Sequence, residues 1–176
     1  MRSFIAIPIP ADASRQLATE KTKLQLPPGC RWVEAGNLHI TLVFLGEQPQ
    51  AKLALLAEKL QQALAGITAI QIQLEKIGGF PSHKSQIIAA HVASNPALAR
   101  LQASVVECVE AEGITLDSKP FIPHITLAYS KRPLLIQNQP TSIGFDADAV
   151  HLTHSKQTPQ GSNYTCLKQI ALHSRH

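Results

Sequence analysis

The tetrapeptide HITL occurs twice in this chain of 176 residues, at positions 39–42 and again at 124–127. Each copy lies within an apolar run, residues 38–45 and 121–129, and each run follows glycine or proline residues that interrupt regular structure. Short apolar runs of this kind are typical of buried strands. We therefore predict two strands, far apart in the sequence, that each carry one copy of the motif.

Side chains two residues apart on a strand project from the same face. His39 and Thr41 are therefore predicted to share one face of the first strand, and His124 and Thr126 one face of the second. The isoleucine and leucine of each copy point to the other face, toward the core. If an approximate two-fold axis relates the two halves, the two imidazoles and the two hydroxyls face one another across a cleft.

This set of side chains suits in-line displacement at phosphorus, because the attacking and leaving oxygens lie on opposite sides of the phosphorus atom. Near neutral pH, one histidine can act as a base on one side and the other as an acid on the opposite side. Threonine hydroxyls can donate hydrogen bonds to the non-bridging oxygens, where negative charge develops. A strained cyclic phosphate opened in this way needs no metal and no other cofactor. The sequence also contains no HExxH motif, carboxylate cluster or P-loop.

A histidine beside a threonine on a strand is often only a half-buried, hydrogen-bonded pair. A third His-x-Thr sequence, at His151 and Thr153, illustrates this alternative, because the polar His154 follows it and no partner copy exists. We interpret this third copy as structural. The two HITL copies, in contrast, are identical to each other, and this repetition favours the functional interpretation for them.

The composition is that of an ordinary globular protein, with 44% hydrophobic and 16% charged residues. The net charge of +4 is mild, and the basic residues are scattered along the chain. Such a charge distribution suits a small anionic substrate better than duplex nucleic acid. Three cysteines without a CxxC pair argue against a disulfide framework or a structural zinc site. The first residues lack the layout of a signal peptide, and no apolar run is long enough to span a membrane. We therefore expect a cytoplasmic protein with no membrane association and no obligate protein partner.

The rest of the chain alternates predicted strands with predicted helices, and no low-complexity linker divides it. The remaining strands are predicted at 4–9, 70–75, 86–92, 149–154 and 164–172, and the helices at 11–24, 49–66 and 95–113. A turn is predicted at 78–82 and a polar loop at 155–163. This pattern indicates one α+β domain over residues 1–176, made of two closely joined lobes.

In their order and spacing, several segments resemble those of the two-histidine phosphoesterases. Among these the chain is most similar to the bacterial and archaeal RNA 2′,3′-cyclic phosphodiesterases, also known as tRNA 2′-5′ ligases. The likeness covers almost the whole chain: FIAIP at 4–8, NLHITL at 37–42 followed by FLG at 44–46, GFP at 79–81, KPFIPHITL at 119–127 and YTCL at 164–167. The resemblance implies two pseudo-symmetric lobes of antiparallel sheet with outer helices, and an active-site cleft between the lobes.

The resemblance also implies an enzyme that opens an RNA-terminal 2′,3′-cyclic phosphate to a 2′-phosphate without a metal. It implies that His39 gives a proton to the departing 3′ oxygen, that His124 takes a proton from the attacking water, and that Thr41 and Thr126 hold the phosphate. With an RNA 5′-hydroxyl in place of water, the same acid and base would form a 2′-5′ linkage. The expected partners are RNA 3′ ends, or nucleotides, that bear a 2′,3′-cyclic phosphate.

Position 129 departs from the family pattern, because relatives commonly carry an arginine where this chain has Tyr129. We count Tyr129 among the substrate-binding residues because a tyrosine can stack on a base; the alternative is a half-buried tyrosine at the edge of the sheet without a role in binding. Strand parity turns Tyr129 away from His124, however, unless the strand ends or bulges at Ala128. Lys131 and Arg132 are then candidates for the missing positive charge. The same parity predicts that Phe44, which follows the first motif, lies in the core.

Three other functions stay open on the sequence alone. The protein could act on a small cyclic nucleotide or on ADP-ribose cyclic phosphate. It could be a non-catalytic module that binds RNA ends in a retained cleft. It could also be a metal enzyme that uses several of its eight histidines.

Overall fold

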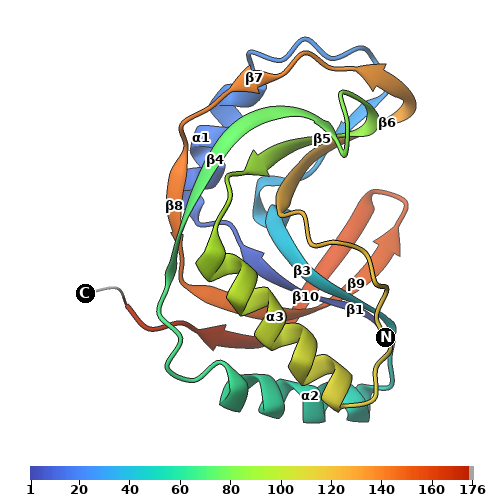
Figure 1. Cartoon of the computed structure of the whole chain (residues 1–176). Helices are drawn as coiled ribbons and strands as arrows, with labels where there is room; N and C mark the ends of the chain where they lie inside the picture. The colour runs from blue at the N-terminus through green and yellow to red at the C-terminus, as the bar shows by residue number, and fades with distance from the viewer. Residues whose placement is uncertain (175–176) are drawn as a thin grey trace.

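The computed structural model describes residues 1–174, which form a ten-stranded sheet, three α-helices and one short 3-10 helix (Figure 1). The strands are β1 (Arg2–Pro8), β2 (Cys30–Trp32), β3 (His39–Glu47), β4 (Ile70–Phe80), β5 (Lys84–Val92), β6 (His124–Leu135), β7 (Gln139–Pro140), β8 (Gly144–Ala147), β9 (Ala149–Thr158) and β10 (Gly161–Ala171). The helices are α1 (Ala11–Lys21), η1 (Ala35–Asn37), α2 (Gln50–Ala63) and α3 (Pro96–Ala111). Within residues 1–174, no helix is both long and apolar enough to cross a membrane.

The two motif strands, β3 and β6, lie next to each other in the middle of the sheet. The strand order is β10-β9-β1-β3-β6-β5-β4-β7, with β2 beside β6 and β8 beside β4, and all of these strand pairs are antiparallel. β3 and β6 meet through one register pair, Ile40 opposite Ile125. At this pair the sheet divides into a first lobe, β10-β9-β1-β3, and a second lobe that contains the remaining strands. The predicted α+β class with antiparallel lobes is confirmed.

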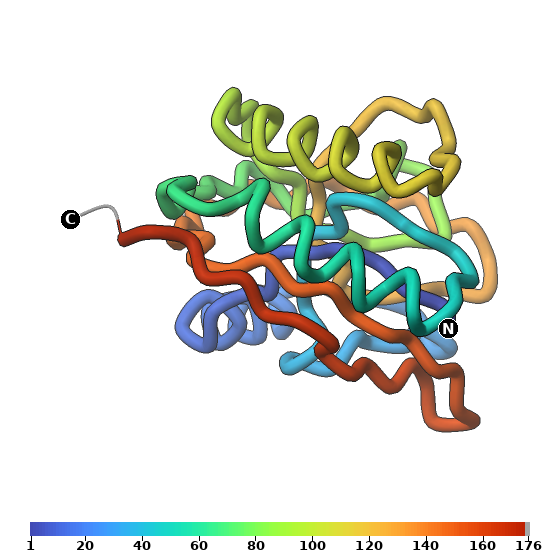
Figure 2. The backbone as a smooth tube through the Cα atoms, turned by 90° about the horizontal axis from the view of Figure 1, so that it is seen from below, coloured from blue at the N-terminus to red at the C-terminus, as the bar shows by residue number. Residues whose placement is uncertain are grey.

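The first lobe buries one face of its strands and leaves parts of the other face to line cavities. On β1, Ile5 and Ile7 are fully buried in the hydrophobic core, whereas the alternating Phe4, Ala6 and Pro8 line a pocket. Helices α2 and α3 lie side by side, as Figures 1 and 2 both show. Each helix contributes one apolar face to the same core, made of Leu53, Leu56 and Leu60 on α2 and of Leu98, Leu101, Val105 and Val109 on α3.

Helix α3 begins and ends where its sequence predicts. The Asn95 side chain accepts a hydrogen bond of 3.0 Å from the Leu98 N–H, and Pro96 occupies the first helical turn. After the helix, Gly113 has φ +81°, a conformation that glycine adopts at little cost. The Asn95 amide also donates to the Gln71 carbonyl at 2.9 Å, so the same residue ties the start of α3 to β4.

The turn predicted at 78–82 is wrong in its first half, because β4 runs to Phe80 and β5 begins at Lys84. Gly78 and Gly79 are strand residues, and a Cβ atom on either one would collide with a neighbouring segment, the Asn138 side chain or the backbone at residues 82–83. These glycines therefore permit close approach of two segments rather than a reversal of the chain.

The polar loop predicted at 155–163 is also wrong. β9 continues to Thr158 and β10 starts at Gly161, so the two strands form a hairpin with only two residues between them. Most side chains in this end of the hairpin are exposed or half-buried on both faces. The segment therefore lacks the alternation of apolar and polar residues by which a strand is predicted. The short strands β2, β7 and β8 were not predicted either.

Candidate active site

The register between β3 and β6 brings the two HITL motifs together. Because Ile40 lies opposite Ile125 in an antiparallel pair, the register sets His39 across from Thr126 and Thr41 across from His124. In a regular ladder the two histidines are then diagonal neighbours, about 7–8 Å apart and somewhat closer between their Cβ atoms. The four polar side chains therefore occupy one face of two adjacent strands.

One cavity of about 440 Å³ is lined by His39, Thr41, His124 and Thr126, and also by Tyr129. All five residues proposed from the sequence as site residues are thus brought to one place. The cavity lies between the lobes, since β3 belongs to the first lobe and β6 to the second. The rest of its wall is mixed, with aromatic, hydroxyl, amide, charged and small apolar residues: Arg2, Ser3, Phe4, Val33, Phe44, Gly46, Glu47, Ser155, Gln157, Ser162 and Tyr164.

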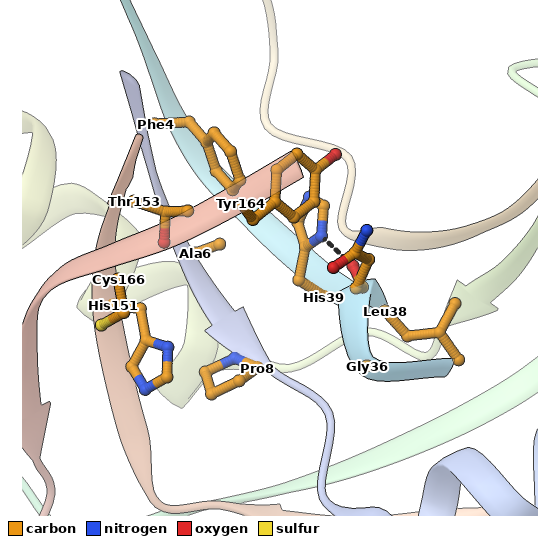
Figure 3. A pocket seen from close by; sticks show the side chains of 11 residues that line it. Phe4, Ala6, Pro8, Gly36, Leu38, His39, His151, Thr153, Tyr164 and Cys166 are labelled. Atoms are coloured by element: carbon orange, nitrogen blue, oxygen red, sulfur yellow. Dashed lines mark hydrogen bonds between the residues drawn. The ribbon is translucent and has the colours of Figure 1, made fainter. Parts of the chain in front are cut away.

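The ring of His39 is held by a backbone hydrogen bond and by two aromatic rings. Its Nδ1 lies 2.7 Å from the Asn37 carbonyl oxygen; since a carbonyl only accepts, Nδ1 carries the proton of this bond. The ring centres of Phe4 and Tyr164 lie 4.9 and 5.5 Å from that of His39. Figure 3 shows these aromatic side chains gathered around His39, with the hydrogen bond dashed. This arrangement leaves Nε2 as the nitrogen available for proton transfer.

His124 has an equivalent support on the second lobe. Its Nδ1 donates to the Ile122 carbonyl at 2.8 Å, again to the residue two positions before the histidine. The ring of Phe80 stacks on the imidazole with centres 3.7 Å apart and an interplanar angle of 17°. The two histidines therefore have the same tautomer in their neutral form, and in each it is Nε2 that is left for a substrate.

Burial lowers the pKa of both site histidines below the ordinary value of 6.5, although the backbone hydrogen bonds oppose this effect. A positive charge on His124 lowers the pKa of His39 further. Near neutral pH, both rings are therefore mainly neutral in the free protein. Protonation of both rings together is disfavoured, which suits a pair that must contain one acid and one base.

Both motif strands bulge immediately after the threonine, at the leucine of HITL. The register passes from Thr126 directly to Ala128 opposite β5, and from Thr41 directly to Val43 opposite β1, so Leu127 and Leu42 are the extra residues. Each bulge reverses the parity of the strand beyond it. From the sequence, Tyr129 could reach the site only if the strand ended or bulged at Ala128. The bulge lies one residue earlier, at Leu127, and Tyr129 lines the cavity.

The prediction that Phe44 lies in the core is wrong for the same reason. Phe44 follows the bulge in β3, lines the cavity and is 73% exposed. Phe44 and Tyr129 stand at matching positions, each five residues after the histidine of its motif.

A positive charge lies over the ring of Tyr129, and it comes from a residue that the sequence did not single out. Arg31 on β2 pairs with Tyr129 on β6, and its guanidinium carbon lies 5.7 Å from the centre of the tyrosine ring. Lys131 and Arg132, the candidates named from the sequence, do not line the cavity, and neither does Arg31; the basic side chain in the cavity wall is that of Arg2.

The aromatic residues that support the histidines were also not assigned a role from the sequence. Phe4, Phe80 and Tyr164 all lie in segments that resemble the family, so a signal for their importance was present. Their contacts with the imidazoles join segments far apart in the chain, and no local pattern predicts such contacts.

The third His-x-Thr copy lies in a smaller pocket of about 240 Å³ that adjoins the ring of His39 (Figure 3). His151 hydrogen-bonds the Gln169 side chain, and Thr153 is buried. The interpretation of this copy as a structural histidine–threonine pair stays a prediction.

Two antiparallel lobes, with a histidine–threonine pair from each lobe in one shared cavity, define a two-histidine phosphoesterase. Comparison with known families agrees, since the model of the 2′-5′ RNA ligase superfamily matches residues 12–159. The chain belongs to the 2′-5′ RNA ligase superfamily, and it is an enzyme of the two-histidine class.

Individual relatives resemble the chain over most of its length. The RNA 2′,3′-cyclic phosphodiesterase of Thermus thermophilus is 30% identical, with 100% of this chain and 92% of the relative covered. That of Methanocaldococcus jannaschii is 28% identical, with 96% and 99% covered. Among solved structures, LigT of Escherichia coli in complex with 3′-AMP is 26% identical and has a TM-score of 0.85, with 97% of each chain covered.

Proposed function

We propose that this protein hydrolyses RNA-terminal 2′,3′-cyclic phosphates to 2′-phosphomonoesters, with His39 as the general acid and His124 as the general base. The observation that carries the proposal is the single cavity lined by both imidazoles and both threonine hydroxyls. The names of the relatives support the substrate class, because several are RNA 2′,3′-cyclic phosphodiesterases. The complex of Escherichia coli LigT with 3′-AMP supports a nucleotide ligand.

In the proposed reaction, water attacks phosphorus from the side opposite the ribose 3′ oxygen. Nε2 of His124 accepts a proton from the water as the new P–O bond forms. The bond from phosphorus to the 3′ oxygen breaks, and Nε2 of His39 gives its proton to that oxygen. The product keeps its phosphate on the 2′ oxygen. Thr41 and Thr126 donate hydrogen bonds to the non-bridging oxygens, where negative charge increases in the transition state.

The lowered pKa values of the two histidines indicate when the acid forms. In the free protein both rings are mainly neutral near pH 7, because burial disfavours the imidazolium. The negative charge of a bound phosphodiester favours the imidazolium and raises the pKa of a ring beside it. We therefore infer that substrate binding brings a proton to one ring, while the positive charge of that ring keeps the other neutral.

Ligation uses the same groups in the same roles. When an RNA 5′-hydroxyl takes the place of water, His124 accepts its proton as the new P–O bond forms, the bond from phosphorus to the 3′ oxygen breaks, and His39 gives a proton to that oxygen, which leaves a 2′-5′ linkage. By microscopic reversibility, the two roles are exchanged only when the 3′-hydroxyl attacks such a linkage and restores the cyclic phosphate. None of these reactions requires a metal or an organic cofactor in this scheme, so we expect turnover to persist in excess EDTA.

The general acid and the general base can be told apart with a substrate whose leaving group departs without a proton from an acid. His39→Ala is expected to lower turnover of a 2′,3′-cyclic nucleotide by at least ~100-fold, but to lower turnover of a p-nitrophenyl phosphodiester far less. His124→Ala is expected to lower both. His154→Ala, which changes a histidine outside the cavity, is the matched control.

Wild-type activity on the cyclic nucleotide in either variant would overturn the proposal. If His124→Ala spared turnover of the p-nitrophenyl ester and His39→Ala did not, His124 would be the general acid and His39 the general base. The alternative substrates are tested on the wild-type protein by comparing turnover of a mononucleotide, an oligonucleotide and ADP-ribose, each bearing a cyclic phosphate. If one of the small molecules were turned over efficiently and the oligonucleotide were not, that small molecule and not RNA would be the substrate.

A further inference from the structure

Arg2, at the start of β1, contributes a positively charged side chain to the wall of the cavity. The residue is exposed, and it forms no ion pair with any residue that the structure describes. Its register partner on β3 is Glu47, which also lines the cavity. The Glu47 carboxylate is instead paired with the amino group of Met1, at 3.2 Å. The guanidinium of Arg2 is therefore free to pair with the anionic group of a ligand.

The end of the cavity at Arg2 is polar. On the other side of β1, Ser3 pairs with His154 of β9, so Ser155 is the residue of β9 that continues the ladder toward Arg2. The hairpin of β9 and β10 lines the cavity with hydroxyl and amide side chains, those of Ser155, Gln157 and Ser162. Such side chains tolerate a hydrated, charged group beside them, and a buried apolar wall does not. The surroundings of Arg2 therefore suit an anionic part of the ligand.

The strand register places Arg2 at a distance from the two HITL motifs. Ala6 of β1 lies opposite Thr41, and Arg2 is four residues from Ala6 along the same strand. At about 3.3 Å per residue, the Cα atoms of Arg2 and Ala6 are about 13 Å apart. The register pair of Phe4 and Phe44 lies between them. Because side chains on a strand stand roughly perpendicular to the sheet, Arg2 and Thr41 reach different groups of a bound ligand.

We propose that Arg2 binds a phosphodiester of the RNA chain on the 5′ side of the nucleotide that carries the cyclic phosphate, an inference that rests on the proposed function. An RNA strand brings one further negative charge with each preceding nucleotide. A guanidinium binds such a phosphate through two parallel N–H···O hydrogen bonds. A nucleoside 2′,3′-cyclic phosphate has no preceding phosphate, so the contact favours an oligonucleotide over a mononucleotide. It contributes to binding and not to the chemical step, because Arg2 touches no reacting atom.

The test varies the number of phosphates that precede the cyclic phosphate. Adenosine 2′,3′-cyclic phosphate has none, the corresponding dinucleotide has one and the trinucleotide has two. Arg2→Gln is expected to raise KM about 10-fold for a substrate whose preceding phosphate it binds. This is the lower end of the range for a hydrogen bond to a charged group, because Arg2 is exposed to water. KM for the adenosine compound is expected to change less than about twofold, as is kcat for all three substrates.

Salt dependence provides a readout that a merely structural role of Arg2 does not change. Each phosphate of a single strand that a protein neutralises adds about 0.7 to the slope with which log affinity falls against log salt concentration. The slope for the longer substrate is therefore expected to be about 0.7 smaller in Arg2→Gln than in wild type. Arg2→Lys keeps the charge and is expected to keep the wild-type slope. Arg100→Gln makes the same substitution at an exposed residue of α3 outside the cavity and is the matched control.

An effect with the dinucleotide assigns the phosphate that joins the last two nucleotides to Arg2, and an effect with the trinucleotide alone assigns the phosphate before it. Two results would overturn the inference: no change in KM with any substrate, or an equal increase with adenosine 2′,3′-cyclic phosphate. A wild type inactive on all three substrates would contradict the proposed function. Calorimetric binding of the 2′-phosphorylated products of the same three lengths to wild type and Arg2→Gln would then still decide the role of Arg2.

Discussion

The stack of Phe80 on His124 allows a prediction about both rate and pH dependence. Phe80→Leu replaces a ring whose centre lies 3.7 Å from that of the imidazole by a smaller side chain without a π-face. The hydrogen bond from Nδ1 of His124 to the Ile122 carbonyl is unaffected. The ring of His124 therefore keeps its tautomer, loses one side of its support and becomes more accessible to water.

The expected size of the effect follows from the lost contact. Aromatic pairs in proteins are worth about 0.5–1.5 kcal/mol beyond their buried area, and we take this range for the contact between Phe80 and His124. If this energy orients His124 in the transition state, its loss lowers kcat/KM by about 2- to 13-fold at high pH, where the ring is neutral in both proteins. Burial is the main reason why the pKa of His124 is low, so greater access to water raises that pKa toward its ordinary value. A base must be neutral to act, and the acidic limb of the profile therefore moves to higher pH.

The assay is kcat/KM for a 2′,3′-cyclic nucleotide measured across the pH range in which histidine titrates. The loss in Phe80→Leu is expected to be largest at low pH and smallest at high pH. Phe145→Leu makes the same substitution on β8 at a residue that does not line the cavity, and its profile is expected to follow wild type. A uniform loss at every pH, with no shift of the acidic limb, would refute the reasoning about burial of His124.

Three further predictions follow from other contacts. Thr41→Val and Thr126→Val each remove one hydroxyl donor and are expected to lower kcat by about 10- to 100-fold with little change in the urea midpoint; wild-type kcat in both would contradict the role of the hydroxyls. Burial lowers the pKa of four histidines, 39, 91, 124 and 151, so the unfolded chain binds more protons below pH 6.5. The stability that these neutral rings provide is present above pH 6.5 and is lost as the pH falls through their folded pKa values, so the urea midpoint should be lower at pH 5 than at pH 7.5; a higher midpoint at pH 5 would show the sign to be wrong. Asn95→Ala removes the α3 cap and is expected to lower the free energy of unfolding by about 1 kcal/mol, measured by urea titration, without changing kcat.

The central strands and the composition of the site could be predicted because their signals are local. Each HITL copy alternates polar and apolar residues, so the side chains that share a face follow directly from the period of a strand. The repetition of the motif then indicated that two such faces meet. The register that brings them together, Ile40 opposite Ile125, is a tertiary pairing that no local pattern specifies.

The wrong prediction for Phe44 and the conditional prediction for Tyr129 have the same physical origin. Beyond each threonine the sequence is continuously apolar, Leu-Val-Phe-Leu in the first strand and Leu-Ala-Tyr in the second. A run without alternation carries no mark of an extra residue, so a bulge at Leu42 or Leu127 cannot be seen in it. The direction of Phe44 therefore could not be predicted, and that of Tyr129 could be stated only conditionally.

The supports of the two imidazoles could not be predicted for a different reason. Phe4 and Tyr164 reach His39 from the two ends of the chain, and Phe80 reaches His124 from the neighbouring hairpin. Such contacts depend on how the strands are ordered in the sheet. The glycine pair before Phe80 indicated a turn by composition alone, whereas its structural effect is to let two segments approach closely.

The pairing of β3 with β6 at Ile40 and Ile125 places the junction of the lobes among the four polar groups of the cavity. Each of the four groups belongs to a direct sequence neighbour of Ile40 or Ile125, so the pair that joins the lobes also sets how the two imidazoles stand relative to each other. The spacing of the imidazoles therefore depends on one antiparallel register, and a slip of one residue would turn one motif's histidine and threonine into the core.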